Sequence, residues 1–246
     1  MSEKGSKTKR NPDWARDELI LALDLYFRID AARTNNANPE IVAVSEILKA
    51  MPIHPAFRGT PNFRNPHSVY MKLSNFLALD PDYNGEGLPK GSKLDEIVWD
   101  EFAGNRAQLA TLAKLIKASV ADPAIGDPEV LADEEEFPEG RIIARVHKMR
   151  ERNKGLVRKK KAQVIQKFGR LRCEVCGFDF AKVYGELGEG FIECHHTKPL
   201  SELSPVGKTA LRDLALVCAN CHRILHRSRP WKTIRQLSDS LSKPEN

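Results

Sequence analysis

Apolar side chains recur at helical spacing in four segments of the first 120 residues. Three of these segments follow an Asn-Pro pair, at Asn11-Pro12, Asn38-Pro39 and Asn65-Pro66. Asn is a strong helix N-cap and Pro suits the first helical position, so each pair predicts a helix start. The clearest periodicity follows the third pair, at Val69, Tyr70, Leu73, Phe76 and Leu77. A fourth helix is predicted over about residues 93–120, with Gly104 as the point where it could bend.

Residues 121–140 have the composition of a linker. They hold eight acidic residues, no basic residue, and the prolines Pro123, Pro128 and Pro138. We therefore expect a helical domain over residues 11–120, an acidic linker over 121–140, and a second domain over 141–246. The first ten residues, MSEKGSKTKR, are basic and polar and are expected to form a disordered tail.

Charge is divided unequally between the two halves of the chain. The net charge is −7 over residues 1–140 and +13 over residues 141–246. Thirteen Lys and Arg crowd into residues 141–172 against the single acid Glu151. This stretch has few helix breakers and is predicted to be a helical lead-in to the second domain. A polyanion is the partner that such a charge favours, whereas the alternative, a solvated helix face, usually mixes both signs.

The cysteines predict a metal site. All five lie in the last 74 residues, and four of them form the pairs Cys173-x2-Cys176 and Cys218-x2-Cys221. Two such pairs can complete the tetrahedral four-sulfur shell of a structural Zn²⁺. A disulfide framework is less consistent with a chain that shows no secretory signal. The fifth cysteine, Cys194, is expected to be a buried thiol.

Four histidines accompany these cysteines and suggest a second metal site. His222 and His226 are spaced i, i+4, so on a helix they share one face and can hold one cation together. His195 and His196 are adjacent, so on a strand they point to opposite sides, and one can bind a metal while the other acts on a water. The alternative is that all four are ordinary surface or core histidines and that zinc is the only metal.

The segments CEVCGFDF, GFIECHHTKPLSEL and LRDLALVCANCHRILH resemble the HNH nucleases, over roughly residues 165–232. The resemblance implies a ββα-metal fold, in which a β-hairpin and a helix surround one divalent ion such as Mg²⁺, Mn²⁺ or Ni²⁺. It implies that His195, His222 and His226 bind this ion. It further implies that His196 is the general base that deprotonates the attacking water, and that the products carry 5′-phosphate and 3′-hydroxyl ends.

Two acidic residues extend this comparison. Asp213 stands where the family usually has an Asn that orients the base through its backbone, so it keeps a hydrogen-bond acceptor but loses the amide donor. Glu193 matches an acidic position that is often found in the motif. Both are therefore candidate catalytic residues beside His196.

The segments FRNPHSVYMKLSNFLALDP and EGRIIARVHKMRERNKG resemble McrA-like restriction endonucleases. In that family a helical N-terminal domain senses 5-methylcytosine or 5-hydroxymethylcytosine in DNA. The candidate DNA contacts in the first domain are Arg58, Arg64, Lys72, His67, Tyr70 and Asn75. The alternative is that these residues are the solvated side of an ordinary helical bundle. The candidates in the second domain are Arg145, Arg152, Lys159, Lys160, Arg223 and Arg227.

The sequence thus predicts an α+β protein, with a helical N-terminal domain followed by a zinc-stapled ββα-metal nuclease domain. We expect a metal-dependent endodeoxyribonuclease that acts on double-stranded DNA with modified cytosine. A homodimer is expected because one such site cuts one strand. The alternatives are an HNH nuclease of homing, phage or toxin type that acts on unmodified DNA, a zinc DNA-binding module without catalysis, and an RNA-processing nuclease. No apolar run is long enough to span a membrane and the N-terminus lacks a signal peptide, so the expected location is the cytoplasm.

Overall fold

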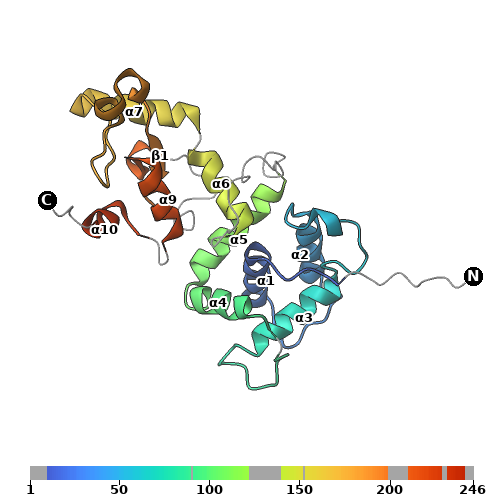
Figure 1. The fold of residues 1–246 in the computed structure, drawn as a ribbon. Coiled ribbons are helices and arrows are strands. Elements are labelled where there is room, and N and C mark those ends of the chain that lie inside the picture. Colours follow the sequence, from blue (N-terminus) through green and yellow to red (C-terminus); the bar gives the residue numbers. More distant parts are fainter. Residues whose placement is uncertain are drawn as a thin grey trace, which may run out of the picture. The chain divides into compact units, whose positions relative to one another are not determined.

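The computed structural model describes residues 10–89, 91–121, 140–151, 153–198, 210–228 and 232–241, with the backbone alone for residues 147–151. The chain divides into two compact units, Met1–Ala144 and Arg145–Asn246, and each is considered by itself (Figure 1). No helix in the described parts of the chain is long and apolar enough to cross a membrane. Most of the predicted acidic linker, residues 122–139, lies outside the described residues.

The N-terminal unit is a helical bundle built around its first helix. Its helices are α1 (Arg16–Arg28), α2 (Pro39–Ala50), α3 (Pro66–Leu77), α4 (Lys93–Phe102) and α5 (Arg106–Val120), with a short 3₁₀ turn η1 (Pro55–Phe57) and the start of α6 (Arg141–Glu151). Every residue from Asp17 to Tyr26 of α1 is buried. Helices α2, α3, α4 and α5 all pack against α1, as expected for a helix that is apolar around most of its circumference.

Two of the three predicted helix starts are confirmed. The side chains of Asn38 and Asn65 each accept a hydrogen bond from a backbone N–H in the first turn of the following helix, and proline takes the first helical position. The prediction at Asn11-Pro12 is wrong, because α1 begins only after Ala15. There the Glu18 carboxylate accepts the Ala15 N–H at 2.7 Å. The Asn11 amide instead donates to the Asn62 carbonyl at 2.9 Å.

The predicted long helix over residues 93–120 is two helices. Helix α4 ends at Phe102, and α5 starts anew at Arg106 with Asn105 as its N-cap. The basic stretch is helical, as expected, and it forms two helices: α6 ends at Glu151, and Asn153 caps α7 (Lys154–Phe168). Helix α7 stops at Gly169, whose φ of +72° is the left-handed conformation that favours glycine after a helix.

Helix α6 is capped by a side chain from α1. The fully buried carboxylate of Asp17 accepts the backbone N–H groups of Ile142 at 3.2 Å and Ile143 at 3.3 Å. A Cβ added at Gly140, where φ is +103°, would lie 2.5 Å from Asp17 Oδ1. The chain after the acidic segment is therefore fixed to α1, and the N-terminal unit extends to Ala144.

The second unit contains a small two-stranded sheet between helices. Its elements are α7, α8 (Phe180–Tyr184), a 3₁₀ turn η4 (Gly185–Gly188), β1 (Glu193–His196), a 3₁₀ turn η6 (Leu211–Asp213), β2 (Leu214–Val217), α9 (Ala219–Arg227) and α10 (Ile234–Asp239). Strands β1 and β2 are antiparallel, with Glu193 opposite Val217 and His196 opposite Leu214. The hairpin followed by α9 agrees with the predicted ββα arrangement.

The buried cap at Asp17 should make stability depend on pH. Burial raises the pKa of Asp17 from 3.8 to about 6, although backbone hydrogen bonds from Ile142, Ile143 and Arg141 lower it. The folded state then binds more protons than the unfolded state between these two values, so stability falls as the pH rises through this window. Asparagine cannot titrate, so the free energy of unfolding of Asp17→Asn should not fall in this window. From pH 4 to pH 7 the difference in unfolding free energy between variant and wild type should therefore shift in favour of the variant by up to about 3 kcal/mol.

Urea denaturation of both proteins across this range measures the difference. Asp100→Asn, at an exposed carboxylate on α4, is the control and should track the wild type at every pH. A constant difference between Asp17→Asn and the wild type would contradict the assignment of a titrating cap.

Candidate metal centres and active site

The four paired cysteines meet in one cluster. The sulfurs of Cys173, Cys176, Cys218 and Cys221 all lie within 4.8 Å of one another. Cys176 Sγ and Cys218 Sγ are 3.8 Å apart. Zn–S bonds of about 2.3 Å in a tetrahedron give sulfur separations of about 3.8 Å, so the cluster has the dimensions of a zinc shell. None of the five cysteines forms a disulfide.

Backbone hydrogen bonds hold the first cysteine pair in a tight turn. The Gly177 N–H donates to the Cys173 carbonyl at 2.8 Å, and the Cys173 N–H donates to the Phe178 carbonyl at 2.8 Å. This tight turn needs the left-handed φ of +75° at Gly177. The adjacent Glu174 N–H donates to the Leu216 carbonyl, which attaches the turn to β2.

The second cysteine pair is the start of a helix. Cys218 is the N-cap of α9, so Cys221 lies in its first turn. The His222 N–H donates to the Cys218 carbonyl at 2.9 Å. His222, which directly follows Cys221, is therefore one of the candidate ligands of the second metal site.

Burial and close spacing shift the pKa values of the clustered thiols in different directions. Burial would raise the pKa of Cys173, but backbone hydrogen bonds, including those from Cys176 and Cys218, hold it below its usual value. Burial and the neighbouring thiols raise the pKa of Cys176 and of Cys221. Without a cation, four thiolates at this spacing repel one another, whereas a divalent metal stabilises all four. The donor set suits a structural metal such as zinc.

Cys194 lies outside this cluster. It is buried, as expected, in a second small core with Ile192, Leu214 and Leu216. Leu156, Val157 and Val164 of α7 pack against the same core. Strand β1 thus has one face toward α7.

The other face of β1 is directed toward α9 and carries the histidine cluster. Ring nitrogens of His195, His222 and His226 lie within 4.8 Å of one another, and the Nε2 atoms of His222 and His226 are 3.0 Å apart. His195 is buried and the other two are half-buried. The structure therefore brings together the three residues predicted to bind the catalytic ion. Strand β1 and α9 lie side by side in Figure 1.

Glu193 contacts this cluster directly. Its Oε2 lies 2.6 Å from Nδ1 of His222. A carboxylate at Nδ1 fixes the imidazole tautomer that has its lone pair on Nε2, which is the form that binds a metal. The sequence identified Glu193 as part of the motif, and the structure places it in contact with His222, 29 residues away; its catalytic role stays a prediction.

The predicted base and its partner lie at the end of β1. His196 is fully buried, and strand alternation directs it to the face opposite His195. The Asp213 carbonyl accepts the Thr197 N–H at 2.9 Å, and its carboxylate lies 3.5 Å from Lys198 Nζ. Asp213 thus fixes the backbone directly after His196. The catalytic roles of His196 and Asp213 stay predictions.

Three of the predicted DNA contacts in the N-terminal unit, Arg64, Lys72 and Asn75, are corrected by their burial. Asn75 is 7% exposed, and its amide donates to the Leu88 carbonyl. Arg64 is 2% exposed, and its guanidinium donates twice to the Glu18 carboxylate at 2.7 and 2.8 Å. Lys72 is 6% exposed and donates to Asp95 at 2.7 Å. Both cations stabilise the bundle interior and cannot reach DNA from there. Arg58 is exposed, although its guanidinium also donates to the Ala50 carbonyl at 3.0 Å.

The predicted contacts in the basic lead-in fall into different environments. Lys159 is exposed on α7. Lys160 donates to the Leu211 carbonyl at 3.3 Å and so fastens α7 to η6. Arg145 is half-buried, and Arg152 lies outside the described residues.

Two predicted contacts lie on the helix of the histidine cluster. Arg223 and Arg227 are both exposed on α9, one turn apart. Because they share this helix with His222 and His226, a phosphate near the cluster would lie close to cationic side chains.

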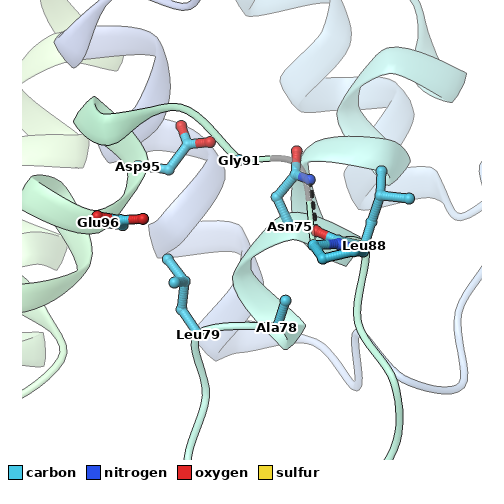
Figure 2. A pocket seen from close by; sticks show the side chains of 8 residues that line it. Asn75, Ala78, Leu79, Leu88, Gly91, Asp95 and Glu96 are labelled. Carbon is cyan, nitrogen blue, oxygen red and sulfur yellow. Dashed lines mark hydrogen bonds between the residues drawn. The ribbon is translucent and has the colours of Figure 1, made fainter.

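A cavity of about 140 Å³ lies in the N-terminal unit between α3 and the start of α4 (Figure 2). Asn75, Leu88, Gly91 and Asp95 are among the residues that line it. The Asn75 amide donates to the Leu88 carbonyl at 2.9 Å, and Asp95 accepts from Lys72. These polar groups serve the fold, so the cavity adds no residue to the candidate site.

The four-sulfur cluster allows a direct test of metal binding. Cys221→Ser should lose the structural zinc, because a hydroxyl replaces one thiolate of a closed tetrahedral shell. The second unit should then lose its cooperative unfolding transition, whereas the helical unit keeps its own. Elemental analysis of the purified protein and thermal unfolding measure the two effects. Cys194→Ala is the matched control and should keep its zinc; equal metal content in both variants would refute the assignment.

The comparisons with known proteins agree with this geometry. Residues 173–228 match the family model described as HNH endonuclease. Searches of curated proteins and of solved structures gave no match. The matched residues include both cysteine pairs, both strands and the histidines of α9. Residues 173–228 of this chain are therefore an HNH endonuclease domain.

Proposed function

We propose that this protein is a metal-dependent endodeoxyribonuclease that cleaves DNA carrying modified cytosine. The observation that carries the nuclease function is the cluster of His195, His222 and His226, with Glu193 beside it, inside the matched HNH domain. DNA is the substrate that such a domain implies. The restriction to 5-methylcytosine or 5-hydroxymethylcytosine, the two product ends and the homodimer belong to the proposal.

The histidine cluster supplies the ligands for the catalytic cation. Three neutral imidazoles leave coordination positions for a phosphate oxygen and water, as a catalytic site requires. A divalent ion such as Mg²⁺, Mn²⁺ or Ni²⁺, when bound, stabilises the charge that develops on the phosphate. Glu193, in contact with Nδ1 of His222, would keep the lone pair of that ring on Nε2, where the ring could hold a cation.

His196 is the proposed base. An imidazole accepts a proton near neutral pH, which is what activation of a water requires. Asp213, through its carbonyl, holds the backbone at Thr197 and thereby the position of His196 at the end of β1. The exposed cations Arg223, Arg227 and Lys159 would hold the flanking phosphates.

Recognition of modified cytosine is proposed for the helical unit. The segment that resembles the McrA-like enzymes forms α3 and the turn before it. Because Arg64 and Lys72 are interior, the reading surface would use the exposed Arg58 and His67 and the half-buried Tyr70. Phosphate contacts by the second unit would then supply affinity, and the helical unit would supply selection.

A second candidate function is a zinc-stabilised DNA-binding domain without catalysis. The complete burial of His196 favours it, because a general base must reach a water. The two candidate functions differ in the expected effect of a His196 substitution on DNA cleavage.

Cleavage of matched plasmids should separate these functions. With Mg²⁺, Mn²⁺ or Ni²⁺ added separately, we expect the wild type to cut plasmids with 5-methylcytosine or 5-hydroxymethylcytosine and to leave the unmodified plasmid intact. His196→Ala should lower the rate at least about hundredfold while binding of the same DNA is unchanged, because only the proton transfer is removed. Equal cutting of all three plasmids would refute the proposed dependence on modified cytosine. An uncut plasmid with every metal, bound equally by both proteins, would favour the non-catalytic domain.

Substitution of Glu193 should weaken the catalytic metal site without removing a ligand. Glu193→Gln keeps the size of the side chain but loses the negative charge at His222 Nδ1, so Mn²⁺ affinity should fall about 10- to 100-fold. Titration calorimetry of the zinc-loaded protein measures this directly. Asp239→Asn, at an exposed carboxylate on α10, serves as the control. Equal Mn²⁺ affinity in Glu193→Gln and the wild type would show that Glu193 does not position the ligand.

A further inference from the structure

An exposed apolar projection lies between the first cysteine pair and β1, on α8, η4 and the residues that follow. Leu187 is 89% exposed, and Val183, Tyr184 and Phe191 are each more than half exposed. The ring of Phe180 stacks on Tyr184 at 6.1 Å and meets Phe191 edge-on at 4.9 Å. This aromatic base supports the turn, so Leu187 is held in water by an ordered structure. We call residues 183–191 the projection.

Close backbone packing keeps the projection in shape. A Cβ added at Gly188 would lie 2.0 Å from the Phe180 carbonyl oxygen, so the turn lies directly on α8. Lys161 of α7 donates to the Gly190 carbonyl at 2.6 Å and ties the end of the projection to α7. The projection and α7 are therefore fixed to each other within one unit.

Helix α7 has a shallow, open apolar groove along one side, next to Lys161, which contacts the projection. The groove measures about 410 Å³ and is lined by Lys154, Val157, Arg158, Lys161, Ala162 and Ile165. Ile165 is 48% exposed and Phe168, further along the helix, is 59% exposed. The adjoining side of α7 packs against the core of the sheet through Leu156, Val157 and Val164, so Val157 lies at the border between that core and the groove.

The projection and the groove have complementary charges. Glu186 and Glu189 flank the apolar tip Leu187, whereas Lys154, Arg158 and Lys161 surround the apolar groove. The projection does not fill the groove of its own chain, because Leu187 is almost fully exposed. An apolar tip between acidic residues is also unsuited to DNA, whose phosphates would be repelled.

We propose that a second copy of this chain occupies the groove. Leu187 of each copy inserts between Val157 and Ile165 of the other, while Glu186 and Glu189 pair with the cations at the groove. Because the projection and the groove lie next to each other on one unit, one two-fold axis forms both contacts at once. The resulting homodimer contains two histidine clusters. Its use for cutting both DNA strands rests on the proposed function, whereas the dimer contact itself does not.

The mass of the full chain in solution, without DNA, tests this contact. Analytical ultracentrifugation at micromolar concentrations should give twice the 27.7 kDa of one chain. Leu187→Ser should raise the dimer Kd about hundredfold, because each of the two copies loses one buried leucine. Ile97→Ser, at a 45% exposed position on α4, is the control and should remain dimeric. A monomeric wild type, or a Leu187→Ser variant with unchanged Kd, would overturn the proposal.

A charge exchange makes the test specific to these two surfaces. One variant carries Glu186→Lys and Glu189→Lys, and the other carries Lys154→Glu and Arg158→Glu. Each alone should be monomeric because like charges face each other, but an equimolar mixture should regain the dimer, since both contacts of the heterodimer then pair opposite charges. Retained zinc shows that each variant is folded. If the mixture stays monomeric, or if the Lys154→Glu, Arg158→Glu variant stays dimeric and loses only DNA affinity, the groove binds something other than a second copy.

Activity is measured separately so that the two proposals can fail independently. Leu187→Ser should still nick one strand of a plasmid but should lose most double-strand breaks at limiting enzyme. A dimeric wild type with no nuclease activity would leave the contact standing and refute the proposed function. A monomeric wild type that makes double-strand breaks at the same rate as its Leu187→Ser variant would refute the contact alone.

Discussion

The four-sulfur cluster is the constraint on which the geometry of the nuclease domain depends. A two-stranded sheet of four residues per strand is marginal in water, and the cores on either side of it are small. Cys218 and Cys221 fix the first turn of α9, while Cys173 and Cys176 are held to β2 through the hydrogen bond from Glu174 to Leu216. Because His222 directly follows Cys221, a metal bound by these cysteines would also set the distance from α9 to His195 on β1.

The N-terminal unit uses its charges in the opposite way from the nuclease unit. Its interior contains the pairs Arg64–Glu18 and Lys72–Asp95, together with the Asp17 cap on α6. A buried ion pair adds little net stability, but loss of one partner leaves an uncompensated charge. In the nuclease unit the same residue types lie on the outside of α7 and α9. Two cations of the helical unit, Arg64 and Lys72, thus serve its fold and are not available to a partner.

Sequence reasoning succeeded where the relevant spacing is local. The two cysteine pairs, the i, i+4 histidines of α9 and the alternation of His195 and His196 all follow from the geometry of a single turn, helix or strand. It failed for Arg64 and Lys72, whose carboxylate partners are 46 and 23 residues away and could not be identified before the helices were packed. The start of α1 was missed for a similar reason, because the Glu18 carboxylate caps the helix after Ala15 and Asn11 bonds elsewhere. The Glu193–His222 contact also joins two elements, so the motif could identify the residue but not its function.

Strand β1 divides the candidate chemistry between its two faces. Glu193 and His195 are directed toward α9 and belong to the metal site, whereas Cys194 and His196 are directed to the face that α7 covers. The helix that carries exposed Lys159 therefore also packs against the strand face of the proposed base. A metal and a base must act on the same phosphate, so the scissile phosphate would have to lie at the end of β1, beside His196, and not on either face alone. In the proposed function, alternate residues of this one strand would supply a metal ligand and a base, so two short strands would be enough to position both.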